Sequence, residues 1–278
     1  MSNITAADVN KLRQTTGAGM MDCKKALVEA EGDFEKAIDI LRKKGQKVAA
    51  NRSDRDAKEG LVLAKTTADG KKAVMVVVNC ETDFVAKNDD FNAFATHILD
   101  LAMEKNPANI DELKALSFNG NGLTVADKII EQTGVIGEKI DVSGYEVVES
   151  ELAVAYNHPG NKLASIVALN KAGGSVADAG KQVAMQIAAM DPVAIDESQV
   201  SADVIAREMS VGREQALQEG KPAEMVDKIA EGKVKKFLKE NTLLNQPSIK
   251  DNKKTVSQTL QEVENGLTVV NFKRIMLG

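Results

Sequence analysis

The spacing of apolar residues changes several times along the chain, and each change predicts a different element. Residues 4–50 carry apolar side chains at helical spacing, interrupted by glycines within residues 17–19 and by Gly32. Glycine is a common stop for a helix because it adopts backbone angles that other residues avoid. This region therefore predicts three short helices.

The next segment changes to the pattern of a β-hairpin followed by a helix. Residues 61–67 and 72–80 are rich in apolar and β-branched side chains, and they flank Asp69-Gly70. An Asp-Gly pair between two apolar runs is a strong signal for a tight hairpin turn. After this hairpin, a helix with apolar residues on one face is expected from about Asp89.

A second segment follows the same order of elements. Residues 152–156 and 163–169 are apolar runs that flank the turn residues 158–161, and an amphipathic helix is expected over about 175–190. The two segments share an order of turn, apolar strand, loop and helix. We interpret them as related subdomains, a repeat of structure more than of sequence.

Residues 181–240 are expected to be almost wholly helical. Two long segments, 201–218 and 222–239, are joined by Glu219-Gly220-Lys221 and predict an antiparallel helical hairpin. The side chains expected to form its contact are Val204, Met209, Leu217, Met225, Ile229 and Val234. A final helix over 254–264 and a final strand over 267–276 are expected after it.

Together these elements predict an α+β fold in several parts. The first three helices resemble a ubiquitin-associated-type bundle, and the charged stretch behind them is typical of a linker. The final strand is expected to return to the second subdomain, so that the helical hairpin interrupts this subdomain in sequence. The expected boundaries are 1–50 for the bundle, 51–60 for the linker, 61–145 for the first core subdomain, 146–180 with 241–278 for the second, and 181–240 for the inserted hairpin.

Composition narrows the classes of function. The net charge of −5 gives no support for a basic nucleic-acid-binding face, and an aromatic content of 3% leaves few side chains for base stacking. No apolar run approaches the roughly 18 residues that span a bilayer. The opening residues 1–5 lack the layout of a signal peptide. We therefore expect a cytoplasmic protein without a membrane segment or direct nucleic-acid contact.

Residue types that carry catalysis or metal binding are sparse. Cys23 and Cys80 are isolated, and His97 and His158 are far apart without Cys or His companions. Residues 17–19 follow a predicted helix instead of a strand, which disfavours a phosphate cradle. The lysines beside Cys23 could activate its thiol, but no base is evident, so a structural thiol is preferred. We expect no enzyme activity, no cofactor and no metal site.

Residues 79–90, Asn-Cys-Glu-Thr-Asp-Phe-Val-Ala-Lys-Asn-Asp-Asp, form the most informative stretch. An apolar run leads into Asp83-Phe84, and a helix start is expected at Asn88. Phe84 therefore stands where a strand gives way to a helix. A ring beside a carboxylate in this position suits insertion into a partner, but most Phe residues are buried in their own core. Spacing alone leaves both interpretations open.

Two motifs carry a resemblance to a known family. Thr82-Asp83-Phe84-Val85-Ala86-Lys87 resembles the signature of bacterial elongation factor Ts, the guanine-nucleotide exchange factor of elongation factor Tu. Residues 12–27, Leu-Arg-Gln-Thr-Thr-Gly-Ala-Gly-Met-Met-Asp-Cys-Lys-Lys-Ala-Leu, resemble that family's N-terminal signature nearly residue for residue. The resemblance extends from residue 4 to about residue 275.

The resemblance implies a binding function in translation elongation. A factor that binds nucleotide-free elongation factor Tu more tightly than the nucleotide-bound form must weaken nucleotide binding. The loss of nucleotide binding free energy equals the factor's own preference between the two forms. It implies that Asp83 and Phe84 wedge near the Mg²⁺ and phosphate site and displace groups that hold the cation, while Thr82 and Val85 fix the loop. The family also places a dimerisation hairpin where the helical hairpin is expected, which would either form a homodimer or simply protrude.

The resemblance also implies further partner contacts, for which it gives less support than for the Asp83-Phe84 loop. They fall on Arg13, Met20, Met21, Lys24, Ile136, Gly137 and His158. Burial in the helical bundle stays an alternative for Met20 and Met21, and a plain turn stays an alternative for Ile136-Gly137.

Two other functions stay open at this point. A ubiquitin-associated-type adaptor would act through residues 1–55 alone and would be indifferent to changes at Asp83 or Phe84. A small-molecule enzyme would need a convergent His, Cys or Gly-rich site, for which the sequence has no motif.

Overall fold

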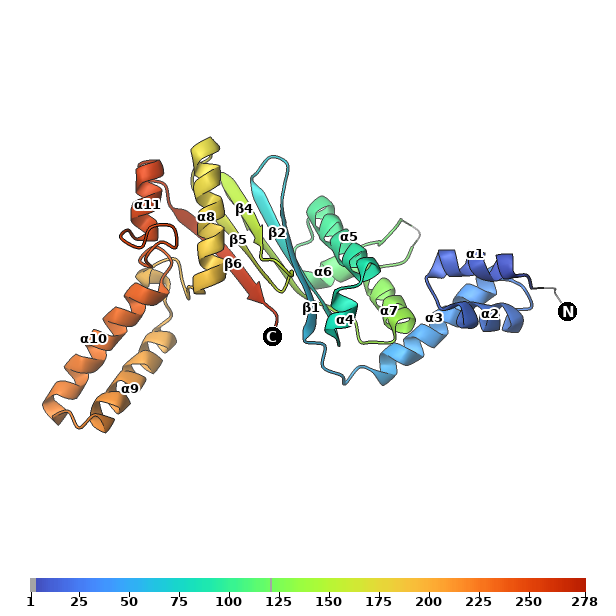
Figure 1. Cartoon of the computed structure of the whole chain (residues 1–278), viewed down its shortest axis with the longest axis horizontal. Helices are drawn as coiled ribbons and strands as arrows, with labels where there is room; N and C mark the ends of the chain where they lie inside the picture. Colours follow the sequence, from blue (N-terminus) through green and yellow to red (C-terminus); the bar gives the residue numbers. More distant parts are fainter. Residues whose placement is uncertain (1–3, 121) are drawn as a thin grey trace. The chain divides into compact units, whose positions relative to one another are not determined.

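The computed structural model describes residues 4–120 and 122–278. Helices and two three-stranded sheets alternate along the chain (Figure 1), so the expected α+β class is confirmed. The first three residues, part of the opening stretch considered for a signal peptide, lie outside the described residues. None of the described helices combines the length and the apolar character needed to span a bilayer.

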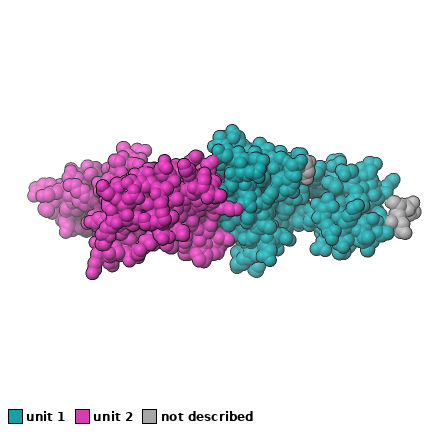
Figure 2. All heavy atoms as spheres, turned by 90° about the horizontal axis from the view of Figure 1, so that it is seen from above, with its two compact units in different colours: residues 1–63, 76–145, 277–278 teal, residues 64–75, 146–276 magenta. Residues whose placement is uncertain are grey.

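The chain divides into two compact units, which Figure 2 colours separately. One contains residues 1–63, 76–145 and 277–278, and the other contains residues 64–75 and 146–276. The domain boundaries expected from the sequence are different and stay a prediction.

The first unit begins with the three predicted helices. Thr5 accepts a hydrogen bond from the backbone of Asp8, whose carboxylate bonds back to Thr5, so this capping box starts the first helix. Gly17, at φ 71°, ends it. Asp33 caps the third helix. The helices are α1 (Ala6–Thr16), α2 (Met20–Glu29) and α3 (Phe34–Asn51).

Helix α3 extends beyond the bundle and packs on α7 (Val125–Ile136). The two backbones approach closely at Gly45 and Gly134, where a Cβ added to Gly134 would lie 2.5 Å from the Cα of Gly45. A side chain at position 134 would collide with the α3 backbone, so glycine is required there, whereas a Cβ at Gly45 would meet only ordinary contacts of 3.5 Å or more. Because α3 reaches Asn51, the connection to the first strand is shorter than the expected linker.

A three-stranded sheet follows, in the order β1-β2-β3. Its second strand is buried from Ala73 to Cys80. The predicted turn at Asp69-Gly70 is confirmed, with Gly70 at φ 71°. The strands are β1 (Glu59–Thr66), β2 (Lys72–Cys80) and β3 (Asp141–Glu149). Strand β3 was not predicted, because polar residues and a glycine interrupt its apolar pattern.

Between β2 and β3 the chain forms four helices. Asn88 caps the second of them through its side-chain oxygen, which confirms the predicted helix start. They are α4 (Asp83–Ala86), α5 (Asp89–Lys105), α6 (Ile110–Ala115) and α7.

The second unit contains an antiparallel sheet in the order β4-β5-β6, in which Val167 lies opposite both Val154 and Phe272. Helix α8 covers one face of it (Figure 1), and α11 packs on α8. Val183 and Ile187 of α8 contribute to this core. The predicted hairpin, helices and returning strand are confirmed as β4 (Leu152–Asn157), β5 (Leu163–Leu169), α8 (Gly174–Met190), α11 (Val256–Val263) and β6 (Val269–Met276).

Helices α9 (Ala202–Gln218) and α10 (Ala223–Asn241) pack on each other, as predicted, but partly through different residues. Leu217 and Met225 are exposed, whereas small residues are buried. A Cβ on Gly212 would lie 3.0 Å from the Cα of Ala230, so close backbone approach replaces contact between large side chains. The buried positions are Gly212, Ala216, Val226, Ala230 and Val234.

The expectation that residues 181–240 are almost wholly helical was wrong for residues 191–201. Helix α8 ends at Asp191, which adopts a left-handed backbone conformation at φ 43°, and Pro192 follows. Proline lacks the N–H that would continue the helix. Only a short 3-10 turn, η1 (Glu197–Gln199), forms before α9.

Both cysteines are buried, as expected for structural thiols. Burial raises the pKa of Cys80 to about 12, and the nearby carboxylates of Glu138 and Glu59 add to this effect. The Cys80 thiol also donates a hydrogen bond to the carbonyl of Thr82 at 3.1 Å.

We expect native protein at pH 8 to resist alkylation of Cys80 by iodoacetamide, because only about one thiol in ten thousand would be ionised with this pKa. Peptide mass spectrometry after timed alkylation measures this, with the denatured protein as the reactive control. Rapid modification of Cys80 in native protein would contradict the assignment.

Gly134→Ala should destabilise the protein by about 1–3 kcal/mol, because the new methyl group collides with the α3 backbone. Gly232→Ala in α10 is the matched control, because nothing lies within 4 Å of the added Cβ. That change should stabilise its helix by roughly 0.5–1 kcal/mol through helix propensity. Calorimetric melting of both variants tests the pair, and equal shifts would refute the close crossing.

Candidate functional site

The loop after β2 presents an aromatic ring to solvent. Phe84 is 81% exposed, although β2 ends shortly before it at the fully buried Cys80. The alternative in which Phe84 closes its own core is therefore excluded. An exposed ring on a folded loop gains roughly 1.5–3 kcal/mol when a partner buries it.

The loop owes its conformation to polar contacts. The Thr82 hydroxyl accepts a hydrogen bond from the backbone of Val85 and thereby caps α4. Glu138 then accepts three hydrogen bonds from the same segment: from the Glu81 N–H at 3.1 Å, the Thr82 N–H at 3.0 Å and the Thr82 hydroxyl at 2.7 Å. These contacts fix the backbone immediately before Phe84.

Glu81 makes the opposite connection. Its carboxylate accepts a hydrogen bond from the backbone N–H of Lys139 at 2.6 Å and pairs with the Arg52 guanidinium at 2.8 Å. The Lys139 N–H, and after it the Arg52 guanidinium, hold the pKa of Glu81 below its usual range. The segment 81–82 and the segment 138–139 are thus joined by two carboxylates, one from each segment.

Asp83 carries an ion pair on the solvent side of the loop. Its carboxylate lies 2.7 Å from Lys87 Nζ, one helical turn further on. Both side chains are well exposed, and an exposed pair of this kind contributes at most about 1 kcal/mol. Asp83 can therefore exchange this contact for another cation or hydrogen-bond donor at small cost.

A hollow of about 530 Å³ opens beside Phe84. It is lined by residues from three separate stretches: the turn after α1, the Phe84 loop with the start of α5, and the end of α7. The lining residues are Gly17, Phe84, Val85, Asn88, Asp90, Phe91, Gln132, Val135 and Ile136. The structure thus brings Phe84 and Val85 together with Ile136 around one hollow.

Helix α2 exposes its first residues. Met20 is 55% exposed and Met21 is 64% exposed, so the core alternative is excluded for both. The buried face of α2 is occupied by Cys23, Ala26 and Leu27 instead.

The remaining expected contact residues lie at different places. Arg13 and Lys24 are exposed on α1 and α2. Gly137 ends α7 at φ 81°, so a turn is present there. His158 lies in the exposed β4–β5 turn of the second unit, with its Nδ1 3.0 Å from the Tyr156 hydroxyl oxygen.

His97 is structural, as expected. Its Nε2 lies 2.8 Å from the carbonyl oxygen of Phe118, and the two rings meet edge to face. No group of three or more His, Cys, Asp or Glu side chains that could hold a metal ion occurs among residues 4–120 and 122–278.

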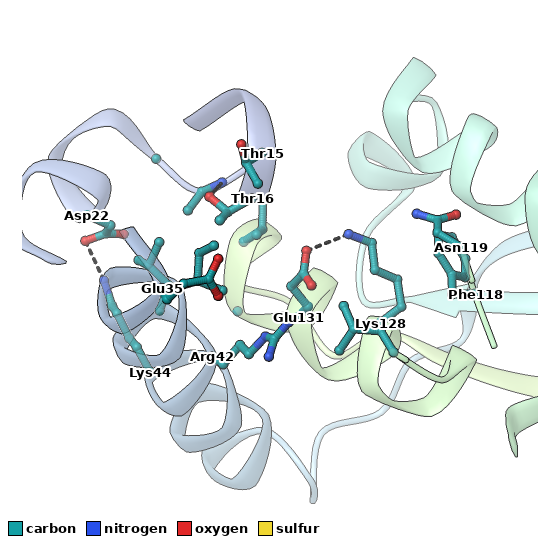
Figure 3. Close-up of a pocket in the computed structure, with 18 residues that line it drawn as sticks. Thr15, Thr16, Asp22, Glu35, Arg42, Lys44, Phe118, Asn119, Lys128 and Glu131 are labelled. Atoms are coloured by element: carbon teal, nitrogen blue, oxygen red, sulfur yellow. Dashed lines mark hydrogen bonds and ion pairs between the residues drawn. The ribbon is translucent and has the colours of Figure 1, made fainter. Parts of the chain in front are cut away.

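A second hollow, of about 400 Å³, lies among α2, α3, α7 and the residues around Phe118. Figure 3 shows the charged side chains that line it. Lys44 forms an ion pair with Asp22, and Lys128 forms one with Glu131. Because these lysines and carboxylates neutralise each other, the hollow has no excess of either charge there. Ile38, Leu41 and Val135 form the apolar part of its lining. This arrangement indicates no particular ligand.

Glu81 and Glu138 were not predicted as functional residues. The two residues are far apart in sequence, and neither belongs to a spacing pattern typical of a site. The only local signal was their position beside residues that the motifs had marked, Thr82 and Gly137.

Comparison with known proteins gives a consistent result over the whole chain. The profile of the family described as Elongation factor TS matches residues 81–278. The chain is 54% identical to elongation factor Ts of Amoebophilus asiaticus over 276 residues, which cover 99% of each protein. It is 50% identical to elongation factor Ts of Christiangramia forsetii and 49% identical to that of Flavobacterium psychrophilum, with full coverage of both chains in each case. The chain belongs to the elongation factor Ts family.

Proposed function

We propose that this chain promotes GDP release from elongation factor Tu by inserting the Asp83–Phe84 loop near the Mg²⁺ and phosphate site of that GTPase. Membership of the elongation factor Ts family makes the chain a guanine-nucleotide exchange factor in translation elongation. The insertion of this particular loop is the mechanism that the geometry supports best.

One observation carries the proposal. Phe84 is exposed on a loop that several hydrogen bonds hold in place, so its exposure is built into the fold. The hollow beside the ring is also lined by Ile136, which the same family resemblance gave as a further partner contact. A rigid apolar projection next to a concave surface suits a wedge that enters between elements of a partner.

The thermodynamics follow from linkage. A factor that binds nucleotide-free GTPase more tightly than the GDP form weakens GDP binding by the same factor, and each tenfold change corresponds to about 1.4 kcal/mol. Phe84 supplies apolar area for the wedge. Asp83 competes for polar groups near the cation, since its own ion pair with Lys87 is exposed and weak.

Other surfaces extend the proposed contact. Exposed Met20 and Met21 on α2 offer flexible apolar side chains, with Arg13 and Lys24 as charged neighbours. Gly137, in the half-buried turn after α7, and His158, in the exposed β4–β5 turn of the second unit, are proposed as further contacts. Thr82 and Val85 hold the loop.

The finer architecture forms part of the same proposal. The first three helices act as a ubiquitin-associated-type bundle, the two hairpin-plus-helix segments are related subdomains, and α9 with α10 is an inserted hairpin of the dimerisation type. We further propose that the chain acts in the cytoplasm without enzyme chemistry, a cofactor or direct nucleic-acid contact.

An adaptor function of the bundle alone has less support. Helix α3 continues beyond the bundle and packs on α7 through the Gly45–Gly134 contact. Val135 of α7 also packs against the core of the bundle. The bundle is therefore built into the first unit.

Phe84→Ala should slow the release of a fluorescent GDP analogue from elongation factor Tu at least about tenfold, because a buried Phe contributes roughly 1.5–3 kcal/mol. The melting temperature of the free protein should stay unchanged, because the ring is exposed. Stopped-flow fluorescence and circular dichroism measure the two effects.

Ile249→Ala is the control, since it also removes an exposed apolar side chain, lies on none of the proposed contact surfaces and should leave the exchange rate unaffected. Exchange at the wild-type rate by Phe84→Ala would refute the wedge. Absence of any acceleration by the wild-type chain would refute the exchange function itself.

A further inference from the structure

We propose that Glu138 is a positioning residue for nucleotide exchange, which acts by holding the Phe84 loop in its projecting conformation. Together with Glu81 it forms what we call the carboxylate clasp, defined by Glu81, Thr82, Glu138 and Lys139. This inference rests on the proposed role of Phe84, but its first test does not depend on that role.

The clasp is reciprocal. The Glu138 carboxylate accepts hydrogen bonds from the backbone of Glu81 and Thr82, and the Glu81 carboxylate accepts one from the backbone of Lys139. Each of the two segments therefore contributes a charged acceptor to the backbone of the other. Hydrogen bonds to a charged group are shorter and about twice as strong as neutral ones.

The loop needs this support because its own helix is too short to be stable alone. Helix α4 contains four residues, Asp83–Ala86, whereas isolated helices below about 12 residues are marginal in water. The exposed ring of Phe84 makes little contribution to packing. Polar contacts at the start of α4, together with the buried Ala86 at its end, therefore hold the helix that carries the ring.

The clasp also connects the loop to the rest of the first unit. The Arg52 guanidinium, at the end of α3, binds the Glu81 carboxylate through both oxygens, at 2.8 and 3.0 Å. Lys139 Nζ donates to the carbonyl oxygens of Ser53 and Arg55, at 2.7 and 2.9 Å. The clasp thus fixes the Phe84 loop to the end of α7 and to the linker behind α3.

The first test measures loop position in the free protein. The chain contains no Trp, so Phe84→Trp introduces a single fluorescent reporter at the tip of the loop. Glu138→Ala in this background should lower the steady-state fluorescence anisotropy of the reporter. Glu104→Ala is the matched control, because Glu104 is exposed and its carboxylate pairs with the adjacent Lys105. An equal anisotropy in both variants would overturn the inference.

The second test is a double-mutant cycle in the exchange assay with elongation factor Tu. Glu138→Ala should lower the maximal exchange rate about tenfold when Phe84 is present and have no further effect in Phe84→Ala, because residues that act as a unit are not additive. A merely structural role would slow exchange by the same factor in both backgrounds, and that result would overturn the inference.

Two further variants guard against general unfolding. Glu138→Gln keeps the shape and one acceptor oxygen, which can still receive both backbone N–H groups, but its NH2 group then replaces the acceptor of the Thr82 hydroxyl and the charge is lost, so an intermediate loss is expected. Thr82→Val removes only the hydroxyl contact to Glu138 and to Val85, and it should also give a partial loss. Full exchange activity in both variants would overturn the inference.

Failure of the proposed function is recognised separately. If Phe84→Ala exchanges nucleotide normally while Glu138→Ala still lowers the anisotropy, the clasp stands as a loop support and the wedge is refuted. If Phe84→Ala is impaired but Glu138→Ala is not, the clasp alone is refuted.

Discussion

The close crossing of α3 and α7 at Gly45 and Gly134 is the contact on which the first unit depends. The helices meet at backbone distance, where a side chain on position 134 would push them apart. The crossing anchors α7, and α7 ends at Ile136 and Gly137, directly before Glu138. The position of the loop-holding carboxylate therefore follows from the packing of two helices that lie far apart in sequence.

The Phe84 loop separates stability from function. Its ring lies outside the core. Hydrogen bonds accepted by the carboxylates of Glu81 and Glu138 help to hold the loop in its conformation. Such an arrangement suits a wedge, because apolar area left exposed in the free protein becomes available to a partner. Asp83 is likewise accessible to a partner, since its exposed ion pair with Lys87 is readily exchanged.

Local patterns were sufficient to predict most of the elements. Caps at Thr5 and Asn88, the turn at Asp69-Gly70 and the apolar periodicities act within a few residues, so they can be read directly from the sequence. The predictions were wrong where polar residues interrupted the apolar pattern of an element or where small residues formed a contact that was expected of large ones. Strand β3 has interspersed polar residues, and the α9–α10 contact uses Gly212 and Ala230 in place of larger side chains.

By itself the sequence determined most of the helices and strands, but not α6, α7 or β3, and, through residues 12–27 and 82–87, the motifs that resemble one family. Only the tertiary structure decided that Phe84, Met20 and Met21 are exposed, because burial depends on which distant segments pack over a side chain. It alone also brought Glu138 to Thr82 and Ile136 to Phe84. Those pairings span more than 50 residues along the chain, and only the folded packing of α7 against α3 and the Phe84 loop establishes them.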